Sequence, residues 1–394
     1  MTGDWSGLRT KLEKEGISLR AHYISETAGN PTGGLQQATQ YAQQIDFGAD
    51  LDLEKLAKLK GGQIHVTFSD RAGNSLSDLD LGALAEVQEI FGAGQDFRLA
   101  ILTYEQSLFD DKLDIKGVWL NVGDDFATSP LYCYFQNNAF CGNPLAPTLD
   151  AGVSTFPQAS WGGIVKFQPE SDLYAQAGAY QVNPLNSETG NGFKLGSEGV
   201  TGIIVPLEVG WTPDKALFSH PGDLRVGGYY DNSAAPDLGA PVNGPEQLMS
   251  GRWGLYLLAD QMIWREGGPS SNRGLTLFAT FTYADPSTAL IQYSWEAGLV
   301  KQGTFAGRDN DSIGLALSQL LVSDSLVNAQ YHANVTDPGS VDVQSYEMDI
   351  ELNYRAQVAP WFALMPNLQY VVQPGGVSST PNAFVLGLQA AVTF

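Results

Sequence analysis

The sequence predicts an all-β protein: a closed transmembrane β-barrel of sixteen antiparallel strands. Three observations predict it. Apolar and polar residues alternate with a period of two along many segments, as in strands with one face in lipid and one in water. The connections between these segments are alternately long and short. The chain also ends in mid-strand, on Phe394, where the end of a soluble domain would more often fray.

The N-terminal residues precede the alternation and have a different period. Trp5, Leu8 and Leu12 are spaced as on one face of a helix. We therefore expect residues 1–17 to form a periplasmic segment with a short helix, and residues 18–394 to form the barrel. Met1 is followed directly by TGDWSGL, without the regions of a signal peptide, which is typical of a mature start.

The alternation is clearest in two segments. In QIDFGADLDL, residues 44–53, the apolar side chains fall on one face, and Gln, Asp and Gly fall on the other. In YEMDIELNYR, residues 346–355, apolar and aromatic residues alternate with acids, Asn and Arg. Each pattern predicts a strand with one apolar and one polar face.

Counted in this way, the chain contains sixteen candidate strands. Several run ten to thirteen residues, close to the length that crosses a bilayer at a tilt. Trp and Tyr residues lie near many of their ends, as in the aromatic girdles of membrane barrels. The strands are expected to start near residues 18, 43, 62, 97, 112, 160, 172, 201, 223, 251, 273, 290, 311, 343, 360 and 383.

The lengths of the connections indicate how the barrel is oriented. Outer-membrane barrels have long external loops and short periplasmic turns, so this alternation places both chain ends on the periplasmic side. The odd-numbered connections are mostly long: 29–42, 70–96, 123–159, 184–200, 232–250, 321–342 and 374–382, with 285–289 as the exception. The even-numbered ones are short (109–111, 169–171, 265–272, 356–359) or intermediate (54–61, 213–222, 302–310).

The composition argues against several functions. Acidic residues number 43 and basic residues 21, so the formal charge is 21 − 43 = −22. Without a basic footprint, nucleic acid is excluded as a partner. No apolar run approaches the roughly 18 residues of a membrane helix. No zinc-binding His pair, GxSxG or P-loop motif occurs, so we expect no enzyme, no metal and no cofactor.

The two cysteines, Cys133 and Cys141, lie in YCYFQNNAFCG, residues 132–142. A zinc site would need two further soft ligands nearby, and a CxxC redox pair is more closely spaced. The pair is therefore interpreted as a structural disulfide, formed in an oxidising compartment.

Several segments, in order along the chain, resemble the OprB family of carbohydrate-selective outer-membrane porins. They are GDWSGLRTKLEKEGI near the N-terminus, the cysteine-containing stretch, WGGIVKFQP, GAYQVNP, HPGDLRVGGYYD and APWFALMPNLQYVVQPGG. The resemblance implies a sixteen-stranded barrel in the outer membrane of a Gram-negative bacterium, through which monosaccharides diffuse. It also implies a signal peptide that this sequence lacks.

Analogy with general porins suggests a role for the third external loop, residues 123–159. In those proteins this loop folds into the barrel and narrows it, and its length here suits the same arrangement. We expect it to fold inward and to set the pore size. The alternative is that it roofs the barrel from outside.

Selectivity for sugars requires aromatic rings against the apolar faces of a pyranose, and charged or amide groups for its hydroxyls. The alternative for each charged candidate is a solvated place on the wall, and for Trp161 a place in the aromatic girdle. The candidates for the lumen are Arg71, Arg98, Glu105, Trp161, Arg225, Gln261, Arg265, Glu266 and Glu347, the last in an acidic row with Asp349 and Glu351.

We therefore expect an outer-membrane porin for the facilitated diffusion of small neutral carbohydrates, such as glucose-like monosaccharides, into the periplasm. One alternative is a non-selective or cation-preferring porin, since an acidic lumen favours cations. Another, of a different class, is a soluble β-sandwich that binds sugars. The expected partners are monosaccharides, outer-membrane lipid and lipopolysaccharide, and the chain is expected to be a monomer or a trimer.

Overall fold

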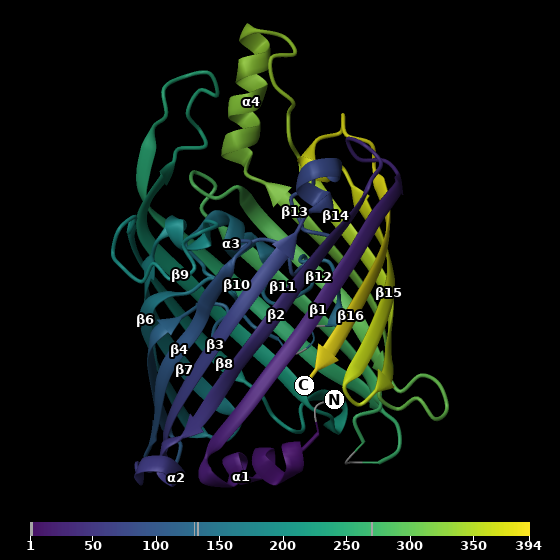
Figure 1. Ribbon diagram of the computed structural model, residues 1–394. Coiled ribbons are helices and arrows are strands. Elements are labelled where there is room, and N and C mark those ends of the chain that lie inside the picture. The colour runs from purple at the N-terminus through teal and green to yellow at the C-terminus, as the bar shows by residue number, and fades with distance from the viewer. Residues whose placement is uncertain (1–2, 130, 132–133, 269–270) are drawn as a thin grey trace.

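The structure, a computed structural model, describes residues 3–129, 131, 134–268 and 271–394. Within them, sixteen antiparallel strands close into a barrel, and β1 pairs with β16 (Figure 1). A closed barrel has no free edge, so the backbone groups of the wall pair with one another, as the bilayer core requires. The predicted barrel is confirmed, and the sandwich alternative is wrong.

The strands lie close to their predicted positions. The largest displacement of a start is four residues, at β2, which was expected at 43 and begins at Thr39. The strands are β1 (Ile17–Thr32), β2 (Thr39–Asp52), β3 (Gly62–Gly73), β4 (Phe97–Leu108), β5 (Leu113–Leu120), β6 (Ser160–Glu170), β7 (Leu173–Val182), β8 (Gly202–Trp211), β9 (Gly222–Pro236), β10 (Leu248–Arg265), β11 (Gly274–Ala284), β12 (Ile291–Gln302), β13 (Ser312–Val322), β14 (Tyr346–Ala359), β15 (Phe362–Val372) and β16 (Ala383–Thr393).

The helix expected near the N-terminus is α1 (Leu8–Glu15). It ends at Gly16, whose φ of 99° is left-handed and favours glycine. The sequence did not predict the helices of the connections, which are α2 (Leu53–Ala57), α3 (Leu145–Asp150) and α4 (Asp324–Thr336). Among the described residues, no helix is long and apolar enough to cross a membrane.

The two ends of the barrel differ. Helix α1, helix α2 and both chain termini lie at one end, and α4 rises from the other (Figure 1). The connections at the first end are mostly short, and the longest of the barrel, 121–159, lies at the second. The first connection of the second end is shorter than expected, residues 33–38, because β1 and β2 extend beyond their predicted limits.

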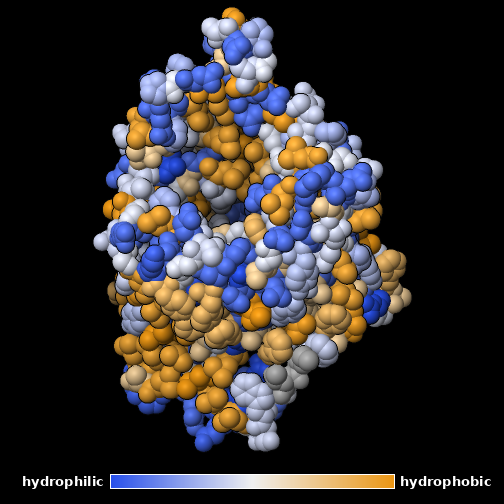
Figure 2. Space-filling model, turned by 45° about the horizontal axis from the view of Figure 1, so that its top comes forward, coloured by the Kyte–Doolittle hydropathy of each residue, from blue (hydrophilic) through white to orange (hydrophobic). Residues whose placement is uncertain are grey.

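The wall has an apolar outer face and a polar inner face. On β8, Val205, Leu207 and Val209 are 40–57% exposed, whereas Glu208 between them is buried. Figure 2 shows apolar side chains gathered on the wall and polar side chains on the connections, around a hollow. This arrangement is that of a barrel surrounded by lipid.

The outer face of β8 offers a test of this orientation. We expect Leu207→Arg to lower the free energy of unfolding by about 2–4 kcal/mol, because a charge at mid-membrane is costly. The matched control is Leu217→Arg, since Leu217 lies in the turn after β8 and is exposed. Urea unfolding in lipid vesicles, followed by tryptophan fluorescence, measures both. Equal losses would contradict a lipid-facing position for Leu207.

Candidate functional site

The third connection at the α4 end, residues 121–159, is bound by carboxylates of the polar strand faces. The backbone N–H groups of Gln136 and Asn137 donate to the Glu351 carboxylate of β14, at 3.1 and 2.8 Å. The Asn137 side-chain amide donates to Asp349 of the same strand, at 3.1 Å. Glu351 and Asp349 are fully buried.

Two further carboxylates hold the same connection from another part of the wall. Glu208 of β8 accepts a hydrogen bond from the N–H of Ala127, at 2.8 Å. Asp231 of β9 accepts one from the N–H of Gly152, at 2.9 Å. The third connection is therefore hydrogen-bonded to strands on distant parts of the barrel.

Aromatic packing supplements these hydrogen bonds. The ring of Phe135 is fully buried, and its centroid lies 5.5 Å from that of Phe140 and 5.7 Å from that of Phe278 on β11. Burial of such rings stabilises a fixed arrangement of the connection against the wall.

The second connection at this end, residues 74–96, is held in the same manner. The N–H groups of Leu84 and Ala85 both donate to the Glu347 carboxylate of β14, at 2.8 Å. The two connections also bond to each other, since the N–H of Glu89 donates to the carbonyl oxygen of Gln136, at 2.9 Å. They therefore form one body attached to the wall.

Two acids in these connections have strongly altered proton affinities. Burial raises the pKa of Glu86 to about 8, although a hydrogen bond from the Ser75 hydroxyl opposes the shift. Burial likewise raises the pKa of Asp150, in α3, to about 8, although the N–H of Ile291 donates to it at 2.8 Å. Both side chains are therefore largely protonated at neutral pH.

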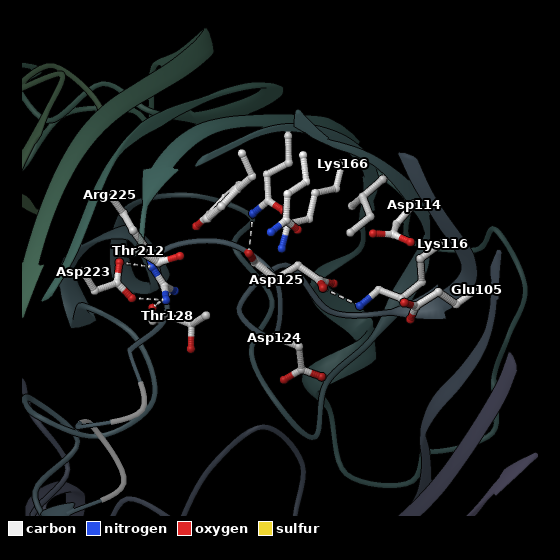
Figure 3. Close-up of a pocket in the computed structure, with 14 residues that line it drawn as sticks. Glu105, Asp114, Lys116, Asp124, Asp125, Thr128, Lys166, Thr212, Asp223 and Arg225 are labelled. Atoms are coloured by element: carbon white, nitrogen blue, oxygen red, sulfur yellow. Dashed lines mark hydrogen bonds and ion pairs between the residues drawn. The ribbon is translucent and has the colours of Figure 1, made fainter. Parts of the chain in front are cut away.

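A cavity of about 470 Å³ lies between the third connection and the strands β4–β9 (Figure 3). Most of the side chains around it are charged or can form hydrogen bonds. They are Glu105, Asp114, Lys116, Asp124, Asp125, Thr128, Lys166, Gln168, Tyr174, Gln176, Thr212, Asp223 and Arg225, together with the apolar Ile164.

Two ion pairs lie in the lining of the cavity. Arg225 Nε lies 3.0 Å from Asp223, and Lys116 forms an ion pair with Asp125 of the third connection (Figure 3). The Lys166 ammonium lies 4.3 Å from the centroid of the Tyr174 ring. The cavity thus presents donors, acceptors and an aromatic ring to a small polar molecule.

A second charged group lies on β1–β4. His65 Nδ1 lies 2.7 Å from Asp50, and Nε2 lies 3.8 Å from Glu105. Arg20 forms an ion pair with Asp50. Of these four residues only Glu105 was predicted from the sequence as a site residue. Asp50 and His65 fall on polar faces of alternating segments, which is the signal that could have identified them.

A family model described as the carbohydrate-selective porin, OprB family, matches residues 36–394. The chain belongs to this family. The predicted family, the location in the outer membrane and the transport of carbohydrates are therefore confirmed, and the family and the fold are those of a channel.

Individual members of the family are similar along the whole chain. Porin B of Pseudomonas aeruginosa is 35% identical over 416 residues, which cover 100% of this chain and 91% of the relative. The putative porin QuiX of Acinetobacter baylyi is 31% identical over 414 residues, covering 100% and 93%. The high-pH structure of Pseudomonas putida OprB is 35% identical, with a TM-score of 0.94, and covers 100% of this chain and 98% of that one.

The structure of this OprB-family chain brings two of the predicted site residues together. Glu105 and Arg225 both line the cavity of Figure 3. Glu347 lies on the polar face, as expected, but is fully buried beneath the second connection.

The two predicted arginines near the α4 end support connections. Arg71 is 6% exposed, and its guanidinium donates to Gln44 at 2.6 Å and to the carbonyl oxygen of Gly92 at 3.2 Å. Arg98 is 2% exposed and donates to the carbonyl oxygen of Asn186 at 2.7 Å. Each fixes a connection to the rim and lies apart from the cavity.

Trp161 lies on the outer face of the wall. Its register partner is Trp119, and the two rings meet edge to face at 5.9 Å. Its indole N–H donates to the carbonyl oxygen of Leu195, and the residue is 45% exposed. This position is that of a girdle residue.

The remaining predicted residues lie at the end that carries the termini. Gln261 donates to backbone carbonyls of the turn that follows β8, among them that of Leu217 at 3.0 Å. Glu266 pairs with Arg273 at 3.0 Å, and Arg265 lies beside it in the sequence at the end of β10.

The predicted disulfide is not tested. Cys133 lies outside the described residues, and Cys141 is buried. The pairing of Cys133 with Cys141 stays a prediction.

The hydrogen bonds of Glu351 allow a direct test of how the third connection is held. Glu351→Gln replaces a charged acceptor by a neutral one. It should lower the free energy of local opening by about 1.4 kcal/mol, so that the Gln136 and Asn137 amides exchange about tenfold faster. Hydrogen exchange with mass spectrometry measures it. Glu266→Gln, at the opposite end, is the matched control. Unchanged exchange in Glu351→Gln would show that the carboxylate does not hold the connection.

The raised pKa values predict a pH dependence of stability. Between their ordinary pKa values, 4.5 and 3.8, and about 8, Glu86 and Asp150 bind protons more tightly in the folded state. Their protonation therefore contributes fully to the free energy of unfolding below about pH 4, and this contribution is lost as the pH rises through about 8. In the wild type we expect the urea midpoint of unfolding to fall between pH 5 and pH 8. The double variant Glu86→Gln and Asp150→Asn, which cannot lose these protons, should show a smaller fall. The exposed pair Asp110→Asn with Asp111→Asn should leave the fall unchanged.

Proposed function

We propose that the chain passes small neutral monosaccharides by facilitated diffusion, through a lumen that the third connection narrows from inside. It makes and breaks no covalent bond. In this proposal the N-terminal segment is periplasmic; its helix α1 lies at the end of the barrel that carries the short connections. The solutes and surroundings it meets are monosaccharides, outer-membrane lipid and lipopolysaccharide, and it binds no nucleic acid.

The inward position of the third connection is supported by what its residues contact. Glu208, Asp231 and Glu351 belong to strand faces opposite to the exposed apolar ones, and all three accept its backbone N–H groups. Those faces are turned toward the barrel axis. On this basis we infer that the third connection crosses the lumen and reduces its width.

The cavity of Figure 3 is the observation that carries the proposal. Its volume of about 470 Å³ lies within the range of small-molecule sites, which is roughly 300–1,000 Å³. Glu105 and Asp223 can accept from sugar hydroxyls, and Arg225 and Lys166 can donate to them. The Tyr174 ring offers an apolar surface to the C–H face of a pyranose.

The charge of the lining supports neutral solutes over anions. Five carboxylates and three cations surround the cavity, so the local balance is 3 − 5 = −2, in a chain of net charge −22. An acidic path repels sugar acids and phosphates and admits neutral sugars. The same excess favours the alternative of a cation-preferring porin without sugar selectivity.

Liposome swelling separates these two functions. A sugar-selective channel should admit glucose faster than a neutral amino acid of similar size, and gluconate more slowly than either. Equal rates for glucose and the amino acid would end the claim of selectivity, while slow entry of gluconate alone would support the cation-preferring porin.

The lining residues provide a test of the path itself. We expect Arg225→Gln and Glu105→Gln each to weaken the block of ion current by glucose about fivefold, because each removes a charged hydrogen-bonding partner. A planar-bilayer titration with glucose measures the block. Trp161→Phe, on the outer face, should leave it unchanged. A loss of block in Trp161→Phe alone would place the sugar path elsewhere.

A further inference from the structure

A groove of about 560 Å³ lies on the outer wall at β13–β15, near the end that carries the chain termini. Its lining is mainly apolar, and Leu352 and Leu368 are each 44% exposed. The residues that matter for its shape and chemistry are Phe305, Ile313, Leu352, Tyr354, Pro366 and Leu368.

The groove coincides with an interruption in the strand ladder. Asn353 pairs with Asn367, and the pairing of β14 with β15 resumes at Ala356 and Leu364. Pro366 lies in the interval, and proline has no N–H to donate to a ladder. Here the Tyr354 hydroxyl is directed to Asp311, in the turn between β12 and β13. Together, the interruption and the direction of the Tyr354 side chain leave a groove on the outer surface of the wall.

The turn of residues 303–311 closes one end of the groove. The Phe305 ring meets Tyr354 edge to face, with centroids 5.8 Å apart, and is half exposed. Arg308 of the same turn has its Nε 2.7 Å from Asp311, and its side chain is 41% exposed. An apolar channel on the wall thus ends beside a guanidinium that solvent can reach.

Three turns at this end of the barrel, between β10 and β15, carry a small excess of cations, although the chain is acidic. Residues 265–273, 301–311 and 355–361 contain Arg265, Arg273, Lys301, Arg308 and Arg355, and three acids, Glu266, Asp309 and Asp311. The local balance is 5 − 3 = +2, against −22 for the whole chain. Such a rim attracts anionic head groups.

We propose that this groove binds one phospholipid of the periplasmic leaflet, with an acyl chain along Leu352 and Leu368 and the phosphate on Arg308. The wall here faces the bilayer, so an acyl chain is the group that meets the apolar part. The basic rim selects an anionic head group by charge complementarity. The end with the short connections faces the periplasm in outer-membrane barrels, which places the phosphate at the level of that leaflet's head groups.

Retention of lipid by the purified protein tests the site. The protein is embedded in nanodiscs of equal parts phosphatidylglycerol and phosphatidylcholine, transferred to a mild detergent and measured by native mass spectrometry. We expect one retained phospholipid, mainly phosphatidylglycerol. Arg308→Gln should reduce retained phosphatidylglycerol about fivefold, and Leu368→Trp, which fills the groove, should abolish retention.

Matched controls lie on the other side of the barrel. Lys215→Gln removes an exposed cation from another turn, and Leu207→Trp enlarges an outward side chain on β8; both should retain lipid as the wild type does. Heat-modifiable gel migration checks folding, and Ile313→Phe serves as a second groove-filling variant. Equal retention in all variants would overturn the proposal. So would a change in oligomer mass in Leu368→Trp without loss of lipid, which would make the groove a contact between copies.

Discussion

The interior depends on one interaction, the hydrogen bond from a backbone N–H of a connection to a buried carboxylate of the wall. Glu208, Glu347 and Glu351 each accept at least one such bond. A buried carboxylate without partners would cost several kcal/mol, and a buried N–H without an acceptor would cost about 1–3 kcal/mol. Each group removes the penalty of the other, so acids can be buried here without a matching number of cations.

The closed wall explains why the donors come from connections. In a closed barrel most wall N–H groups are bonded to the neighbouring strand, so polar side chains of the inner face find few backbone donors within their own sheet; the N–H of Ser233, which donates to Asp231 of the same strand at 2.8 Å, is one of them. An irregular segment has N–H groups without partners and must find acceptors when it is buried. The second and third connections are therefore complementary to the acidic inner face: the connections have N–H donors without acceptors, and the inner face has carboxylate acceptors without donors.

The alternation of residues predicted the strands and, where its phase is unbroken, the faces of their polar side chains, because a period of two is a local property. It placed Glu347 and Glu351 correctly on the inner face. It could not show that residues more than two hundred positions away in the sequence cover them. β4 has one extra residue, Ala100, opposite the step from Thr67 to Phe68 of β3, and this bulge changes the phase of the alternation between Arg98 and Glu105. Trp161 was predicted with two alternatives, the lumen and the aromatic girdle; it lies with Val165 and Phe167 on the exposed face of β6, and its ring meets that of its register partner Trp119.

The pairing of charges around the cavity bears on how a channel can recognise a sugar and still release it. Arg225 is already bonded to Asp223, and Lys116 to Asp125. A hydroxyl that approaches either pair replaces part of an existing interaction, so the net gain in free energy is a small difference between similar terms. An unpaired guanidinium in the same place would bind more tightly and hold the solute longer. In the proposed sugar path, preformed ion pairs would thus supply specific donors and acceptors with weak net affinity, which is the condition for rapid passage.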